Sequence, residues 1–182
     1  MATIISMLRG VNVGGHNQIK MDALRSLYES LGLKNPQTYV QSGNVVFTTE
    51  ERNLVRLIKR IEEGFERKFG FRAGVVVRTA SELRDVSAQN PFAKRRGIHP
   101  GKLLVLFFNE EPDQDDCALL QRVKAQGEEV RTDGRQFYLY FPDGAGRSKL
   151  FAATGRLKKL GTCRNWNTVS KLLEMAEKLE AH

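Results

Sequence analysis

The chain has 182 residues, of which 41% are hydrophobic and 27% are charged, the balance of a soluble globular protein. This length fits one large domain or two compact halves of about 90 residues each, and it excludes a mini-protein that depends on disulfides for stability. Lysine and arginine outnumber aspartate and glutamate by 29 to 21, which gives a net charge of +8 and favours anionic partners.

Disulfide, metal and membrane patterns are missing from the sequence. Cys117 and Cys163 lie far apart without a C-x-x-C motif, and His16, His99 and His182 share no metal-ligand spacing. The apolar N-terminal run lacks the cationic start and the cleavage site of a signal peptide. No apolar run reaches the roughly 18–20 residues of a membrane-spanning helix. We therefore expect a reduced, cytoplasmic protein with no cofactor and no membrane contact.

The first half of the chain predicts the element order β-α-β-β-α-β, which is typical of a ferredoxin-like unit. Alternating or continuous β-prone runs indicate the strands, and apolar residues at helical spacing indicate the helices. The expected elements are a strand at 3–8, a helix at 21–31, a hairpin at 38–49, a helix at 51–69 and a strand at 73–79.

The second half predicts the same order again, followed by a terminal helix. The turn at Asp133-Gly134 is a strong hairpin signal, and Gly155 is a weak point in the second helix. The expected elements are a strand at 102–109, a helix at 113–126, a hairpin at 128–141, a helix at 148–161, a short strand at 161–165 and a helix at 167–182.

A short helix and a loop separate the two halves. The loop carries Pro91, Gly97, Pro100 and Gly101, which interrupt regular structure. We therefore predict an α+β protein of two tandem ferredoxin-like units with antiparallel sheets, plus a C-terminal helix. The expected domains are residues 1–91 and residues 92–182.

The first candidate site is the glycine-rich loop at 8–20, which follows a strand and precedes a helix. Backbone N–H groups in such a loop can hold an anion, and Arg9 would add positive charge. The spacing of Gly10, Gly14 and Gly15 matches neither the dinucleotide fingerprint nor the P-loop. A structural role, in which the glycines supply positive φ angles in a tight crossover, is the preferred interpretation.

The second candidate is the hairpin tip Gln41-Ser42-Gly43-Asn44. Polar side chains on a rigid turn can present hydrogen bonds to a ligand. Asparagine and glycine are also the residues that a turn requires for backbone reasons alone, and this structural interpretation is again preferred.

The third candidate is a basic tract between Gly144 and Leu173, which contains no aspartate or glutamate. Trp166, the one tryptophan, lies within it among hydrogen-bonding residues, and arginine beside an aromatic ring is a common phosphate and base partner. A merely solvated face carries equal weight. The cations of the tract are Arg147, Lys149, Arg156, Lys158, Lys159, Arg164 and Lys171.

Several motifs together resemble the domain-of-unknown-function family 1697. They are LRGVNVGG, MDALRSLYESLG, TYVQSGNVVF, VVVRTASEL, NPF, SKL and TCRNWNTVSKLL, which cover nearly the whole chain in this order. The resemblance implies a bacterial, cytosolic α+β protein of two ferredoxin-like units, and it implies no activity, cofactor or catalytic residue. The matching positions are Arg9, Gly10, Asn12, Gly14, Gly15, Gln41, Ser42, Gly43, Asn44, Ser148, Lys149, Leu150, Arg164, Asn165, Trp166, Asn167 and Thr168.

These polar motif residues come from both halves, and we hypothesise that they meet in a shared cleft. The cleft would bind a phosphate-bearing anion, either a nucleotide-like metabolite or nucleic acid, with arginine and lysine supplying charge and Trp166 stacking or walling the pocket. The candidate ligand-binding residues are Arg9, Asn12, Gly14, Gly15, Gln41, Ser42, Asn44, Ser148, Lys149, Arg164, Asn165, Trp166 and Asn167.

Two alternatives remain open. An enzyme acting on a phosphorylated small molecule could use Ser148 or Lys149, although His16 is the only base near the glycine-rich loop. A non-catalytic scaffold would instead bury Gln41, Asn44 and Asn165 with all their hydrogen bonds made inside the protein.

Overall fold

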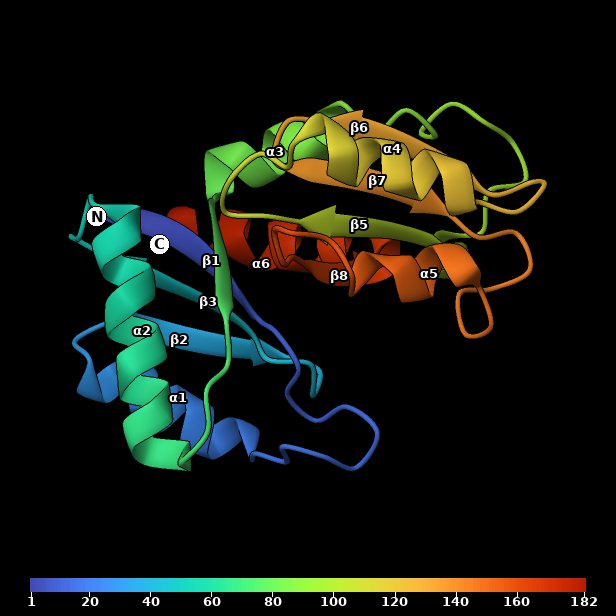
Figure 1. The fold of residues 1–182 in the computed structure, drawn as a ribbon. Helices are drawn as coiled ribbons and strands as arrows, with labels where there is room; N and C mark the ends of the chain where they lie inside the picture. Colours follow the sequence, from blue (N-terminus) through green and yellow to red (C-terminus); the bar gives the residue numbers. More distant parts are fainter. The chain divides into compact units, whose positions relative to one another are not determined.

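The computed structural model describes residues 1–182 and contains two four-stranded antiparallel sheets and six α-helices (Figure 1). The chain divides into two compact units by its internal contacts. The first unit is Met1–Asp85 with Lys171–His182, and the second unit is Val86–Ser170. The division therefore groups residues 86–91 with the second unit and most of the terminal helix with the first, while the sequence predicts a boundary after residue 91.

The first unit contains one sheet with the strand order β2-β3-β1-β4. β1 lies in the interior of this sheet, antiparallel to both β3 and β4, with Ile5 opposite Val46 on one side and Arg78 on the other. The elements are β1 (Ala2–Leu8), α1 (Met21–Ser30), β2 (Lys34–Tyr39), β3 (Asn44–Thr49), α2 (Leu54–Phe69) and β4 (Val75–Thr79), followed by α3 (Ala80–Ala88).

Helices α1 and α2 pack on one face of the first sheet (Figure 1). Their apolar stripes, which include Leu24 and Ile61, meet the strand residues that alternate toward them, such as Ile4 and Phe47. A strand turns alternate side chains to one face, and residues three and four apart share one face of a helix. Period-two and helical spacing in the sequence therefore predicted this layer correctly.

In the outer strand β4, two backbone N–H groups donate hydrogen bonds to glutamate side chains. The Val75 N–H donates to Glu62 Oε1 (3.0 Å), and the Thr79 N–H donates to Glu82 Oε2 (2.8 Å). An edge strand with free N–H groups is a template for pairing with another chain. These carboxylates occupy two of those groups.

The second unit contains a sheet with the equivalent strand order, β6-β7-β5-β8. Residues of α4, α5 and the strands form its core, among them Leu120, Leu150 and Phe137. The elements are a 3-10 turn (Pro100–Lys102), β5 (Leu103–Phe107), α4 (Gln114–Val123), β6 (Glu129–Asp133), β7 (Gln136–Tyr140), α5 (Lys149–Thr154), β8 (Thr162–Asn165) and α6 (Trp166–Glu180), whose last turns belong to the first unit.

The helix expected at 148–161 is wrong in its length, because α5 ends at Thr154 and Gly155 caps it. The following residues are held as a turn by a carboxylate of α4. Asp116 is buried, and it accepts hydrogen bonds from the backbone N–H groups of Lys158 (3.0 Å) and Lys159 (3.3 Å). Those N–H groups are therefore committed to Asp116. The expected short strand is confirmed as β8.

Gly161→Ala is expected to lower the free energy of unfolding by about 1–3 kcal/mol, the usual effect of overpacking. A Cβ at this position would lie 2.5 Å from the Phe107 carbonyl oxygen and 2.9 Å from the Phe108 ring. Thermal unfolding measures the change, since 1 kcal/mol shifts the melting temperature of a chain this size by about 2–4 °C. Gly146→Ala is the matched control, because nothing lies within 4 Å of a Cβ there. Equal melting temperatures for the two variants would contradict this packing.

Candidate functional site

The glycine-rich loop between β1 and α1 is closed by the side chain of Asn12. Asn12 Nδ2 donates to the carbonyl oxygens of Ile19 (3.2 Å) and Gln41 (2.7 Å), while its Oδ1 accepts the Ile19 N–H (2.8 Å). Both N–H groups of this amide are thus used within the protein. Asn12 therefore ties the two ends of the loop to each other and to the hairpin tip, which supports the structural interpretation of this residue.

The hairpin tip is packed against the end of β1. A Cβ on Gly43 would lie 2.7 Å from a methyl of Val11 and 2.8 Å from Leu8 Cβ, and its φ is +79°. Asn44 is fully buried, and its Nδ2 donates to the Tyr39 carbonyl (3.0 Å) and to Ser42 Oγ (2.9 Å). Glycine is required at position 43 by both space and backbone conformation.

Only some of the predicted site residues in this loop and hairpin tip are exposed. Gly14, Gly15 and Gln41 are exposed, and Arg9 is half-buried. The scaffold hypothesis required Gln41, Asn44 and Asn165 to be buried, and of these only Asn44 is. The structure therefore joins the first-unit candidates into one cluster whose polar side chains are largely engaged in holding the turn.

Several candidates of the second unit also make hydrogen bonds within the protein. Ser148 Oγ accepts the Phe151 N–H (3.3 Å) at the start of α5 and donates to Glu128 Oε2 (2.5 Å). Asn165 Oδ1 accepts the Thr168 N–H (2.9 Å), which caps the last helix. Trp166 is half-buried and Asn167 is exposed.

Arg164 is buried rather than presented at the surface, with 8% of its area exposed. Its guanidinium donates to Thr162 Oγ1 (2.7 Å) and to the Cys163 carbonyl (2.8 Å). Burial lowers the pKa of Arg164 to about 10, because removal from water disfavours the charged form. A surface role for this cation is not supported by its position.

Acids neutralise three further cations of the basic tract, two of them from distant parts of the sequence. Lys158 pairs with Asp113 and Asp115 at 3.1 and 2.9 Å, and this raises its pKa well above the usual range. Lys159 pairs with Glu110, and Lys171 pairs with Glu174. The cations of the tract that remain exposed and unpaired are Arg147, Lys149 and Arg156.

Two of these unpaired cations line a hollow of about 640 Å³ on the second unit, which we call the cationic hollow. Its lining consists of Arg122, Val123, Lys149, Ala152 and Arg156. Helices α4 and α5 lie against each other, so that Arg122 near the end of α4 shares the hollow with Lys149 at the start of α5. All three cations are exposed and make no ion pair or hydrogen bond. Arg122 was not predicted from the sequence, because it lies outside the basic tract.

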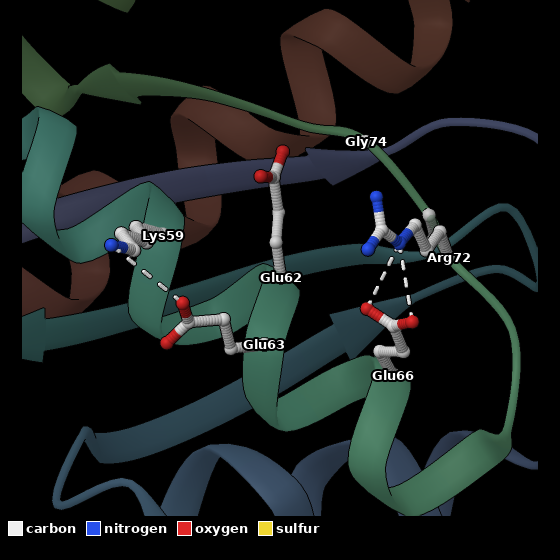
Figure 2. Close-up of a pocket in the computed structure, with 7 residues that line it drawn as sticks. Lys59, Glu62, Glu63, Glu66, Arg72 and Gly74 are labelled. Carbon is white, nitrogen blue, oxygen red and sulfur yellow. Dashed lines mark hydrogen bonds and ion pairs between the residues drawn. The ribbon is translucent and has the colours of Figure 1, made fainter.

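A second hollow, of about 410 Å³, lies on the first unit between α2 and the segment that enters β4 (Figure 2). It is also charged, but its charges are paired with one another. Lys59 lies 3.8 Å from Glu63, and Arg72 Nε donates to both carboxylate oxygens of Glu66 at 3.1 Å. The remaining carboxylate, Glu62, accepts the Val75 N–H described above. This hollow therefore offers little unsatisfied charge to a ligand.

Metal and thiol chemistry have no support in the structure. No group of three or more histidine, cysteine or acidic side chains is placed to hold a metal ion. Burial raises the pKa of Cys163 to about 12, and burial followed by the charges of Asp116, Asp113 and Glu111 raises that of Cys117. A thiol with a raised pKa is a poor nucleophile.

No helix has the length and apolar character needed to cross a membrane.

The comparisons with known proteins identify relatives but no activity. A family described as "Protein of unknown function (DUF1697)" matches residues 1–138. Among curated proteins, none matches the chain. The solved structure of conserved bacterial protein SP0830 from Streptococcus pneumoniae is similar, with a TM-score of 0.79, 22% identity, and coverage of 97% of this chain and 99% of that chain. At this identity the likeness shows the fold alone.

Asn12→Gly is expected to lower the free energy of unfolding by about 1–3 kcal/mol, because it leaves hydrogen-bonding groups of Ile19 and Gln41 without their partner. Glycine tolerates the positive φ of 53° at this position, so the substitution isolates the loss of hydrogen bonds. Hydrogen exchange should also become faster at the Ile19 amide. Asn17→Gly, at φ 52° with a single side-chain bond to the Gly10 carbonyl, is the control. Identical exchange at Ile19 in both variants would refute the role of Asn12.

Both thiols should react more slowly with a disulfide reagent at mildly alkaline pH in the native protein than in the unfolded chain. The unfolded thiol has a pKa of about 8.5, while the folded pKa of Cys163 is about 12. The folded state therefore keeps its proton where the unfolded state loses it, and the contribution to stability falls as pH rises between these values. Rapid labelling of the native protein would contradict this assignment.

Proposed function

Since the chain belongs to the DUF1697 family, whose description assigns no function, we propose from the geometry that it binds a phosphate-bearing anionic ligand at the cationic hollow. The ligand class is a nucleotide-like metabolite or nucleic acid. The observation that carries this proposal is the set of three cations, Arg122, Lys149 and Arg156, that line one hollow without any acidic neighbour in the lining.

The electrostatics of the hollow favour an anion. Like charges gathered around one space repel, and a bound phosphate would offset that repulsion while accepting hydrogen bonds from each cation. Arginine presents a planar fork that matches two phosphate oxygens, and lysine supplies a compact point charge. Two arginines and one lysine around one hollow supply both kinds of contact.

Residues of α5 and the turn after it form one wall of the hollow. Lys149, Ala152 and Arg156 are spaced by three and four residues, so that they follow one side of α5 and the turn after it. Ala152 leaves space between the two cations because its side chain is a single methyl group. The buried Asp116 bonds to the turn just beyond Arg156 and so restrains that segment.

The proposed activity is binding rather than catalysis. The residues that line the hollow include no carboxylate, imidazole, hydroxyl or thiol that could act as a base or a nucleophile. The expected cleft between the two halves, with Arg9, Gly14 and Gly15 as further contacts, stays a prediction. The present proposal does not depend on it.

We also infer a ferredoxin-like fold for each unit and a reduced, cytoplasmic setting. The repeated β-α-β-β-α-β order and the equivalent strand orders of the two sheets support the fold. The two free cysteines fit a reducing compartment.

The test is a thermal-shift titration with ATP, a sugar phosphate and an oligonucleotide. A site occupied at one hundred times its dissociation constant stabilises the folded state by about 2.7 kcal/mol, which raises the melting temperature by several degrees. The triple variant Arg122→Ala, Lys149→Ala, Arg156→Ala should abolish the shift.

The matched control removes the same charges elsewhere. Arg52, Arg96 and Lys34 are exposed and their side chains are unpaired, so the variant Arg52→Ala, Lys34→Ala, Arg96→Ala has the same net charge as the hollow variant. It should retain the full shift. An equal loss in both variants would mean that net charge alone binds the anion, and it would overturn the proposal, as would the lack of any shift in the wild-type protein.

A further inference from the structure

Resting on the proposed function, we propose that the cationic hollow is part of a larger surface that binds the phosphodiester backbone of nucleic acid without regard to sequence. The surface consists of five exposed, unpaired cations, which we call the basic surface: Arg122, Lys124, Arg147, Lys149 and Arg156.

Hydrogen bonds around Glu128 connect the two segments that carry the outer cations of this surface. Glu128 Oε1 accepts the Ala125 N–H (2.7 Å), and Glu128 Oε2 accepts the Ser148 hydroxyl (2.5 Å). Lys124 immediately precedes Ala125, and Arg147 immediately precedes Ser148. Lys124 and Arg147 are therefore brought near each other, beside the hollow that Arg122 and Lys149 line.

Glu128, which connects these two segments, does not form an ion pair with any of the five cations. Both of its oxygens are committed to the hydrogen bonds just described. Elsewhere in the second unit, cations and acids neutralise one another, as in the pairs of Glu129 with Arg95 and Arg131. Lys94 and Arg96, in the loop before β5, are the other exposed cations of this unit that have no partner.

The character of the hollow favours a backbone over a small metabolite. Small-molecule sites are concave and mostly apolar, with a few polar groups that fix the orientation of the ligand. This hollow contains no aromatic ring to stack a base and no buried polar side chain to select one. Every cation of the basic surface is exposed. The surface can therefore bind a ligand mainly through its positive charges. A chain of phosphates can contact several of these exposed cations at once.

The proposal predicts how strongly the affinity for DNA depends on salt concentration. Each phosphate neutralised on duplex DNA contributes about −0.9 to the slope of log K against log salt concentration. Contacts by three to five cations therefore predict a slope between about −2.7 and about −4.5. Affinity should fall by roughly 40-fold to roughly 500-fold between 50 and 200 mM salt.

The experiment measures fluorescence anisotropy of a labelled 20-base-pair duplex with the full chain across a series of salt concentrations. A second duplex of scrambled sequence should bind with the same affinity. The hollow variant (Arg122→Ala, Lys149→Ala, Arg156→Ala) should lose most of the slope, and adding Lys124→Ala and Arg147→Ala should remove the rest. The control variant (Lys34→Ala, Arg52→Ala, Arg96→Ala) should keep the wild-type slope.

Three results would overturn this inference, and they separate it from the proposed function. Binding of ATP or a sugar phosphate through the hollow, without binding of the duplex, would leave the proposed function intact and reject the nucleic-acid surface. A strong preference for one duplex sequence would reject recognition of the backbone alone. Binding of neither small phosphates nor the duplex would reject both proposals.

Discussion

The buried carboxylate of Asp116 is the contact on which the second unit's candidate site depends. Placed on α4, it accepts the backbone N–H groups of Lys158 and Lys159, which follow α5. Hydrogen bonds to a charged group are worth about 1.5–3 kcal/mol each. They hold the turn after α5 against α4, the same two helices that place Lys149 and Arg122 around one hollow. The geometry of the cations thus rests on a buried carboxylate that is not part of the lining of the hollow.

The two units share a strand order but differ in the charges that line their hollows. In the first unit, Asn12 and Asn44 use their hydrogen bonds to join a loop to a hairpin tip, and the charges of the hollow in Figure 2 pair with one another. In the second unit, three unpaired cations line one hollow. Because exposed ion pairs add little to stability, leaving these cations free costs the fold little and keeps them available.

Local patterns in the sequence predicted most of the fold, and the family was recognised correctly from its motifs. Strand alternation, helical spacing and the Asp133-Gly134 turn depend on neighbouring residues, so they can be read directly. The helix expected at 148–161 was too long, because its end depends on a distant residue. Asp116 holds Lys158 and Lys159 in a turn, and it lies far away in the sequence. β2 begins earlier than expected, at Lys34, because an outer strand tolerates Pro36.

The candidate site was harder to predict for the same reason. Acids distant in sequence neutralise Lys158 and Lys159, Arg164 is buried, and Arg122 joins Lys149 only through helix packing. None of these facts follows from residue spacing. The outer strand β4 shows a different use of carboxylates, which here accept hydrogen bonds from backbone N–H groups of the strand. A foreign strand approaching this edge would first have to displace Glu62 and Glu82 from the amides of Val75 and Thr79. Stacking of copies through that edge, the kind of contact that builds a fibril, therefore carries the cost of breaking these two hydrogen bonds.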